Sequence, residues 1–484
     1  MAFAIDYRRC CGALLAVMLT TLLVWFGTGV NFSWPLLWFA PLPVLLFALR
    51  SSWWGAALAA VLSWFVGNLN MWHYYDVVLH APPIIRIQIF VLPAIVFMAA
   101  VLLFRVLLQR CAWWSALLAF PAMWVSFEYV LNLVSIHGAA ESLSYSQLNF
   151  LPVLQLASIT GLWGISFLVM LFPAALAIGL HIRHSAPKRA FAIAGVGLGV
   201  LGLVVVFGAI RLSMPVPGQR VKVGLIASDQ PANVDMAAEG ADTAHLFHDY
   251  AAKAEALAAQ GAKVIVLPEK LGVVGAPDTE STNALFQSLA DKTKADIVVG
   301  LILISWPVAY NQARVYSPDA PVLTYNKHHL LPPFESNLTS GAAVTLMSKP
   351  AATWGVAVCK DMDFTPLSRQ YGTKSVGLML VPGWDFDLDR WWHGHMAVMR
   401  GVEDGFSIAR AAKQGYLTVS DNRGRILAET QSNTAPFATL VADVPTGHDT
   451  TLYVVLGDWF AWLTLATFCF TLVQFYRLRK NPRT

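Results

Sequence analysis

Seven long stretches of the chain contain no Asp, Glu, Lys or Arg, so most of its first half cannot fold as a soluble domain. They span residues 10–49, 51–75, 87–104, 111–127, 142–182, 190–210 and 459–476. Each can supply about 20 apolar residues, enough to cross the hydrocarbon core of a bilayer as a helix. The first stretch is long enough for two helices, broken near residues 29–33. The sequence therefore predicts eight spans, centred near residues 20, 42, 62, 96, 122, 172 and 200 and, for the last, covering about 452–476.

The overall composition agrees with a membrane protein. Charged residues make up 13% of the 484 residues and hydrophobic ones 56%, whereas soluble domains average about 25% charged residues. Lys and Arg number 33 against 29 Asp and Glu, a net charge of +4. The chain thus lacks the basic excess of a nucleic-acid-binding protein. A cleavable signal peptide is the alternative for the first apolar stretch, but no small-residue cleavage site precedes the next one.

The basic residues near the spans predict orientation, because cytoplasmic loops retain Lys and Arg. The basic residues of the two termini and of every second loop share one side of the membrane: Arg8, Arg9, Arg50, Arg105, Arg110, Arg183, Lys188, Arg189, Arg477, Arg479, Lys480 and Arg483. The opposite short loops contain only Arg86. We therefore expect a bacterial inner-membrane protein with both termini in the cytoplasm and residues 211–451 in the periplasm.

The outward segment has a different pattern, in which short apolar runs alternate with helical ones. Strands are expected over 221–228, 263–269, 295–304, 354–361, 375–384, 416–421 and 425–430, and helices over 244–260, 283–292 and 391–405. This alternation predicts an α/β domain with layered sheets. The expected domains are residues 1–210 with seven transmembrane helices, the catalytic domain 211–451, and residues 452–484 with the eighth helix and a basic tail.

Cys359 is the only cysteine of the outward domain, since Cys10, Cys11, Cys111 and Cys469 lie in or beside membrane spans. It has no partner there for a disulfide. A lone thiol in an oxidising compartment is prone to oxidation, so the sequence favours a chemical role for it. A buried, apolar role in packing is the alternative.

Three reactive side chains lie at or just after predicted strand ends. Glu269 follows IVLP, Lys327 lies in TYNKHHLLPPFE, and Cys359 ends VAVC. Taken singly, a Glu or Lys at a strand end is usually a solvated loop residue. Together, the three supply a base, an oxyanion stabiliser and a nucleophile for acyl transfer.

In this chain order, Glu269, Lys327 and Cys359 resemble the triad of the nitrilase superfamily. Within it, the chain is similar to the apolipoprotein N-acyltransferase family, in which seven membrane helices precede a nitrilase-like domain and one follows it. The similarity rests on SWFVGNLNMW, WVSFEYV, SYSQLNFLPVLQLASITGLWGISFLVM, YNKHHLLPPFE and MRGVEDGFSIAR. The resemblance implies an αββα sandwich for the outward domain and a supporting role for Glu335, eight residues after Lys327.

The resemblance also implies an activity. A fatty acyl chain would pass from a phospholipid, through a thioester on Cys359, to the N-terminal amine of a lipoprotein. Glu269 would act as the base, while Lys327 and a backbone N–H near Lys360 would stabilise the oxyanion. This chemistry requires no cofactor.

Other residues are candidates for substrate contacts. Trp384, Trp391 and Trp392 in GWDFDLDRWWHGH are candidates for an acyl-contacting lid or a simple interfacial anchor, and Glu403 is a further candidate contact. Glu128 lies in the fifth span, where a carboxylate is costly in lipid, so it faces a substrate cavity or pairs inside the bundle. The HGH motif lacks a third ligand at suitable spacing, so we expect no metal site.

Two departures from the family pattern leave the specificity open. Lys360 and Asp361 follow the cysteine where the family has an aromatic residue and a glutamate, and the segment between Lys327 and Cys359 is shorter than the family pattern implies. One alternative is a membrane-tethered nitrilase-type amidase or a paralogous N-acyltransferase with a different amine or amide substrate. The other is a catalytically silent scaffold or lipid-binding protein, which would hold if the three reactive side chains did not converge.

Overall fold

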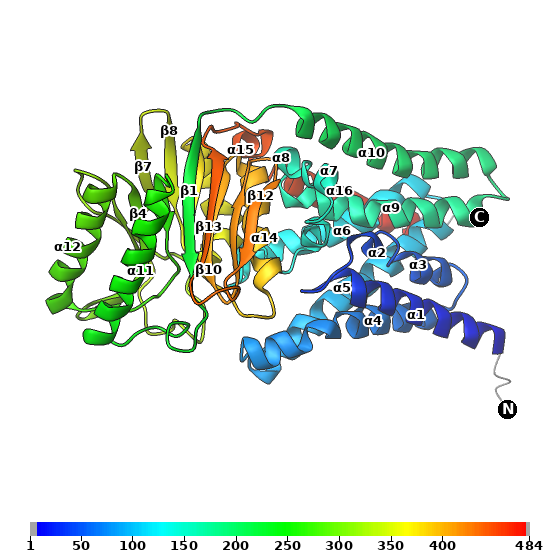
Figure 1. Cartoon of the computed structure of the whole chain (residues 1–484). Coiled ribbons are helices and arrows are strands. Elements are labelled where there is room, and N and C mark those ends of the chain that lie inside the picture. The colour runs from blue at the N-terminus through cyan, green and yellow to red at the C-terminus, as the bar shows by residue number, and fades with distance from the viewer. Residues whose placement is uncertain (1–6, 481–484) are drawn as a thin grey trace. The chain divides into compact units, whose positions relative to one another are not determined.

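The computed structural model describes residues 7–480 and divides into two compact units (Figure 1). The helical unit contains the chain up to Val134, Glu141–Arg211 and the chain from Asp458 onward, and the α/β unit contains Ser135–Ala140 and Leu212–Gly457. The side chains of Arg8, Arg9 and Cys10, and Arg483 as a whole, lie outside the part that the structure describes. Six residues that follow a membrane helix thus belong to the α/β unit.

Within residues 7–480, five helices are long and apolar enough to cross a membrane, so the chain is a multi-pass membrane protein. They are α5 (Pro83–Gln109), α6 (Trp113–Val134), α9 (Leu162–Ile182), α10 (Pro187–Ser213) and α16 (Trp459–Lys480). They coincide with the spans expected near residues 96, 122, 172 and 200 and with the last one. Helices α1 (Tyr7–Gly27) and α4 (Trp53–Asn68) cover the centres expected at 20 and 62. Short helical segments complete the unit: Leu69–Met71, Tyr74–Val78, Leu143–Gln147, Leu151–Leu154 and Ala157–Thr160.

Two of the expected spans are not single helices. The region near residue 42 forms α2 (Trp34–Leu37) and α3 (Leu42–Ala48), because the intervening Pro41 has no N–H to donate and its ring clashes with the preceding turn. The helix expected over 452–476 divides into α15 (Leu452–Leu456) and α16 at Gly457. Gly457 has φ +64°, a conformation that favours glycine.

The α/β unit contains two sheets. The first has the order β13 (Ala438–Pro445), β1 (Arg220–Ala227), β2 (Val264–Val266), β4 (Asp296–Ser305), β5 (Val308–Tyr316) and β6 (Leu323–Asn326), with β3 (Val273–Val274) also paired to β4. The second has the order β12 (Ile426–Gln431), β11 (Tyr416–Ser420), β10 (Ser407–Lys413), β9 (Val376–Trp384), β8 (Ala352–Val356) and β7 (Thr345–Lys349). Strands β1, β2 and β4 run parallel, as do β8, β9 and β10.

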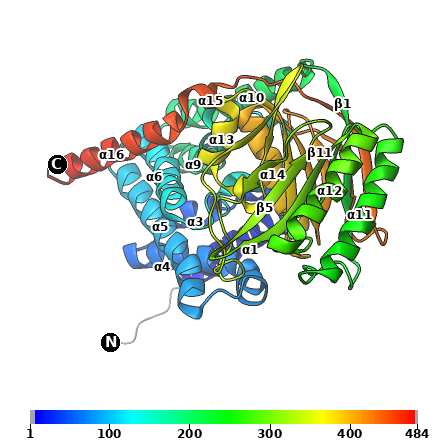
Figure 2. The same cartoon turned by 90° about the vertical axis from the view of Figure 1, so that its left-hand side faces the viewer.

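The alternation of side chains along the strands explains the layers. On β1, Val223 and Leu225 pack in the core between the sheets, whereas Ile226 packs in the core beneath α11 (Ala241–Ala259) and α12 (Ala276–Thr293). Figures 1 and 2 show α11 and α12 side by side on the outer face of the first sheet. Helices α13 (Thr365–Thr373) and α14 (Arg390–Asp404) pack on the second sheet. The layers therefore follow the order αββα, as the nitrilase resemblance implies.

The expected strands and helices of this domain are all found, but helix α13 and strands β3, β5, β6, β7, β10 and β13 were not expected. The expected strand over 354–361 ends early, since β8 stops at Val356 and a 3₁₀ turn, Cys359–Asp363, follows it. This turn carries the candidate nucleophile.

Candidate active site

The loops after β2, β6 and β8 bring Glu269, Lys327 and the turn of Cys359 together. Glu269 follows β2, and its backbone N–H donates to the carbonyl oxygen of Gly383 at 3.2 Å. Gly300 on β4 permits this course of the chain, because a Cβ there would lie 2.6 Å from Glu269 Cα. Lys327 follows β6 directly. Glu269, Lys327 and Cys359 are far apart in the sequence, but the strands that precede them place their side chains at one end of the sheets.

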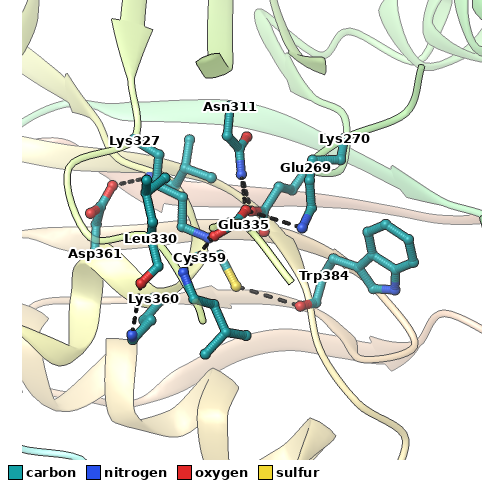
Figure 3. Close-up of polar contacts among 12 residues, drawn as sticks. Glu269, Lys270, Asn311, Lys327, Leu330, Glu335, Cys359, Lys360, Asp361 and Trp384 are labelled. Atoms are coloured by element: carbon teal, nitrogen blue, oxygen red, sulfur yellow. Dashed lines mark hydrogen bonds and ion pairs between the residues drawn. The ribbon is translucent and has the colours of Figure 1, made fainter. Parts of the chain in front are cut away.

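Lys327 is the centre of a buried ion network (Figure 3). Its Nζ donates to Glu269 Oε1 at 2.8 Å and to Glu335 Oε2 at 2.9 Å. Asn311 on β5 joins the same two carboxylates, since its Nδ2 lies 2.5 Å from Glu269 Oε1 and 2.6 Å from Glu335 Oε1. Lys270 Nζ donates to Glu335 Oε1 at 3.0 Å. All of these side chains except Lys270 are almost fully buried, so hydrogen bonds within the protein, and not contacts with water, fix their geometry.

The charges of this network fix its protonation. Burial alone would lower the pKa of Lys327, but the carboxylates of Glu269 and Glu335 raise it well above its usual value. Burial would raise the pKa of Glu335, but Lys327 and Lys270 lower it to about 2. The ammonium of Lys327 and the carboxylate of Glu335 are therefore both charged at neutral pH.

Cys359 has a left-handed backbone conformation and a protonated thiol. Its φ is +48°, in the left-handed region that a residue other than glycine adopts at a cost and that clusters at functional sites. Burial, and next the charge of Glu269, raises the pKa of its thiol to about 12. The thiol donates to the carbonyl oxygen of Trp384 at 3.5 Å (Figure 3). The sulfur therefore rests protonated beside the network.

The two residues after the cysteine hold neighbouring segments in place. Asp361 accepts from Tyr325 Oη at 2.7 Å and from the backbone N–H of His329 at 2.8 Å. Lys360 Nζ donates to the carbonyl oxygens of Leu330 at 3.0 Å and Ile136 at 2.6 Å, and burial lowers its pKa to about 8. Lys360 and Asp361, the two residues that depart from the family pattern, thus connect the turn of Cys359 to the loop after Lys327 and to Ser135–Ala140.

The tryptophans expected as lid residues have different surroundings. Trp384 lies beside Cys359, with Lys413 Nζ 3.6 Å and Lys270 Nζ 5.2 Å from its ring centroids. Trp391 stacks on His395 with 3.9 Å between the rings. Trp391 and Trp392 are both half-buried on α14.

The two remaining candidate carboxylates lie in other networks. Glu403 is fully buried on α14, with Arg400 Nη1 2.7 Å from its Oε2, so its ion pair is made with its own helix. Glu128 of α6 accepts from Trp124 Nε1 and Leu143 N, both at 2.8 Å, and from Ser142 Oγ at 3.0 Å. Glu128 is thus bound inside the helical unit, as one of its two expected roles requires.

Several residues near the sulfur were not predicted from the sequence to contribute to the site. Asn311 lies on a strand that was not expected, and Asp385 and His393 lie in the GWDFDLDRWWHGH segment without a recognisable spacing. The sulfur of Cys359, a carboxylate oxygen of Asp385 and a ring nitrogen of His393, all atoms that can bind a metal, lie within 4.8 Å of one another. Arg410 and His393 already bind the oxygens of Asp385, at 2.8 Å for the Arg410 Nη1 contact. We therefore assign this cluster no metal.

Comparison with known proteins adds the following similarities. Residues 20–176 match the model of the apolipoprotein N-acyltransferase N-terminal domain, and residues 225–453 match that of carbon-nitrogen hydrolase. The apolipoprotein N-acyltransferase of Geobacter metallireducens is 29% identical over 387 residues, 73% of each chain. That of Allorhizobium ampelinum is 26% identical over 464 residues, 85% of this chain and 82% of the relative. An amidase from Nesterenkonia sp. aligns with a TM-score of 0.41 and 21% identity over 48% of this chain and 93% of the amidase.

Proposed function

The chain belongs to the apolipoprotein N-acyltransferase family of the nitrilase superfamily, and from this premise we propose that it transfers a fatty acyl chain from a phospholipid to the N-terminal amine of a lipoprotein. The names of its relatives support this acceptor. The five membrane-spanning candidates support a lipid donor. We propose that the acyl group is carried as a thioester on Cys359.

The buried network beside Cys359 is the observation that carries the proposal. Lys327 Nζ lies within 2.9 Å of both Glu269 and Glu335, so a base and a fixed positive charge accompany a buried thiol. Such a set supports acyl transfer through a covalent intermediate. Glu335 acts as a positioning residue, because it holds the ammonium of Lys327.

In the first half-reaction, Glu269 takes the thiol proton of Cys359 and the thiolate attacks the sn-1 ester carbonyl carbon of the phospholipid. Lys327 and a backbone N–H near Lys360 stabilise the oxyanion, an effect worth about 3 to 4 kcal/mol per donor in a comparable hydrolase. The carbon–oxygen bond then breaks. Glu269 returns the proton to the departing alkoxide, so lysophospholipid leaves and the thioester remains.

In the second half-reaction, the α-amine of an S-diacylglyceryl cysteine attacks the thioester carbon. Glu269 takes the proton that the amine loses, and the carbon–sulfur bond breaks as the amide forms. The thiolate of Cys359 then recovers its proton from Glu269. Neither half-reaction requires a cofactor.

We propose that the membrane part comprises eight spans, with both termini in the cytoplasm and the α/β domain in the periplasm. The alternating distribution of basic residues supports this orientation. Both substrates carry acyl chains, and lifting these into water costs about 0.8 kcal/mol per CH₂. An active site that receives both substrates at the level of the bilayer avoids this cost.

A paralogous N-acyltransferase or a tethered amidase is the second candidate. Lys360 favours it, because a buried ammonium on the residue next to the nucleophile changes the charge of the site. The same cysteine chemistry would then act on a different amine or amide. Rescue of a bacterial strain depleted of its own apolipoprotein N-acyltransferase distinguishes the two, since only a lipoprotein acyltransferase restores growth.

The direct test is mass spectrometry of the full-length protein in detergent after incubation with phosphatidylethanolamine. We expect an acyl adduct on Cys359, which a synthetic S-diacylglyceryl lipopeptide removes as it becomes N-acylated. Cys359→Ser and Cys359→Ala should form no such adduct, whereas Cys469→Ser, in the last membrane helix, should behave as wild type. An adduct on another residue, or full activity in Cys359→Ala, contradicts the proposal. A silent scaffold predicts no adduct at all.

A further inference from the structure

A second group of charged side chains lies against the sulfur of Cys359. A carboxylate oxygen of Asp385 and a ring nitrogen of His393 lie with the sulfur within 4.8 Å of one another. Asp385 directly follows β9 and is buried, and His393 lies in the first turn of α14 with its side chain 15% exposed. This group is distinct from the network of Glu269 and Lys327.

Both nitrogens of the His393 ring face carboxylates. Nδ1 lies 2.8 Å from Asp385 Oδ1, and Nε2 lies 3.3 Å from Asp363 Oδ1. An ionised carboxylate only accepts, so each nitrogen needs a proton to interact favourably. A ring with both protons is the imidazolium. Burial would lower the pKa of His393, but Asp363 and then Cys359 raise it, with Asp385 adding to the effect, well above its usual value.

Arg410 keeps Asp385 ionised. Its guanidinium on β10 donates to both carboxylate oxygens, with 2.8 Å between Nη1 and Oδ2. Burial would raise the pKa of Asp385, but Arg410 and His393 lower it. Glu429 on β12 lies 3.6 Å from His395 of α14 and so belongs to the other histidine of the HGH motif.

The ring of His393 lies between the negative charges of Asp363 and Asp385. Arg410 binds Asp385 and also interacts with Asp389, while Lys360 interacts with Asp363. Without a positive charge at His393, both carboxylates would face a sulfur that must itself become negative. Lys327 cannot offset this charge alone, because Glu269 and Glu335 both bind it.

We propose that His393, held as an imidazolium between Asp363 and Asp385, is a charge partner of Cys359 that stabilises its thiolate. The inference rests on the proposed nucleophile and adds a positioning residue that the triad does not contain. Ionisation of the thiol then depends on two groups of charges. The network of Glu269 and Lys327 contains the base, and the group of His393 and Asp385 contains the imidazolium.

The test measures the thiol itself. In the full-length protein in detergent, with Cys10, Cys11, Cys111 and Cys469 replaced by Ser, the rate of alkylation of Cys359 by iodoacetamide is followed against pH. His393→Gln removes the charge, so we expect alkylation at pH 7.5 to slow about tenfold, as one unit of thiol pKa requires. His393→Lys should restore most of the rate. His395→Gln, on the same helix, is the control and should react as the parent protein does.

An unchanged rate and pH profile in a folded His393→Gln protein overturns the inference. If that variant does not fold, deuterium exchange at the C2 position of the His393 ring in the wild type gives the answer, since this exchange reports the ring pKa. A pKa at or below the ordinary value of about 6.5 overturns the inference. Alkylation needs no acyl donor, so failure here is distinguishable from failure of the proposed acyl transfer, which the adduct on Cys359 tests.

Discussion

The thiol of Cys359 donates its hydrogen bond to the backbone carbonyl oxygen of Trp384, 3.5 Å from the sulfur. Glu269, the proposed base, meanwhile accepts from Lys327 and Asn311. Nucleophile and base thus each have another partner in the resting protein. The thiol proton of Cys359 must therefore leave this carbonyl oxygen before Glu269 can take it.

Replacing Glu269 by Gln separates its two effects on the sulfur. Loss of the base should reduce formation of the acyl adduct on Cys359 by at least about a hundredfold. Loss of the negative charge should at the same time lower the pKa of the thiol, because Glu269 contributes to raising it. Mass spectrometry measures the first effect and the pH profile of alkylation measures the second. Glu280→Gln, exposed on α12, is the control, and a Glu269→Gln protein that still acylates contradicts the assignment.

Replacing Glu335 by Gln should make the protein less stable at neutral pH. The pKa of Glu335 is lowered to about 2, against about 4.3 in an unfolded chain. The carboxylate therefore adds stability above about pH 4.5, and the contribution disappears as the pH falls toward 2. The shift corresponds to about 3 kcal/mol.

The measurement for Glu335→Gln is the melting temperature in detergent, followed by tryptophan fluorescence from pH 7 to pH 3. The variant should melt lower at pH 7 and change less than wild type on acidification. Glu255→Gln is the control, because its ion pair with Lys292 is exposed and is worth at most about 1 kcal/mol. Equal melting temperatures for Glu335→Gln and wild type at pH 7 would show that Lys327 does not need its second carboxylate.

The apolar strands of the domain were predictable because their residues face two cores. β1, β2 and β4 are almost wholly apolar where they are buried, and this pattern is typical of parallel strands covered on both faces. β5 and β10 were not predicted, since Asn311 and Arg410 interrupt them. The buried amide of Asn311 donates to Glu269 and Glu335, and the buried guanidinium of Arg410 donates to Asp385. These partners come from segments distant in sequence, so a local window of sequence does not reveal them.

The candidate site divides in the same way. Residue type and position at strand ends identify Glu269, Lys327 and Cys359 as candidates, but they do not identify the neighbours of Cys359 in the HGH segment. His393 gains its charge from Asp363 and Asp385, which converge only after folding. The break in the helix near Pro41 has a local cause, because proline has no N–H to donate within a helix. Proline is also uncharged and apolar, so a prediction of spans from charge-free stretches does not detect the break.

Replacing Lys360 by Met should loosen the segment Ser135–Ala140. Lys360 Nζ donates to the carbonyl oxygen of Ile136 at 2.6 Å, and the adjacent contact from Ala139 N to Asp363 O is 3.0 Å. A hydrogen bond from a charged donor contributes about 1.5 to 3 kcal/mol, so its loss should speed hydrogen–deuterium exchange at Ala139 about tenfold or more. Peptide-resolved exchange measures this directly. Lys374→Met, exposed after α13, should leave exchange unchanged, and equal exchange in both variants would show that Lys360 does not hold this segment against the turn of Cys359.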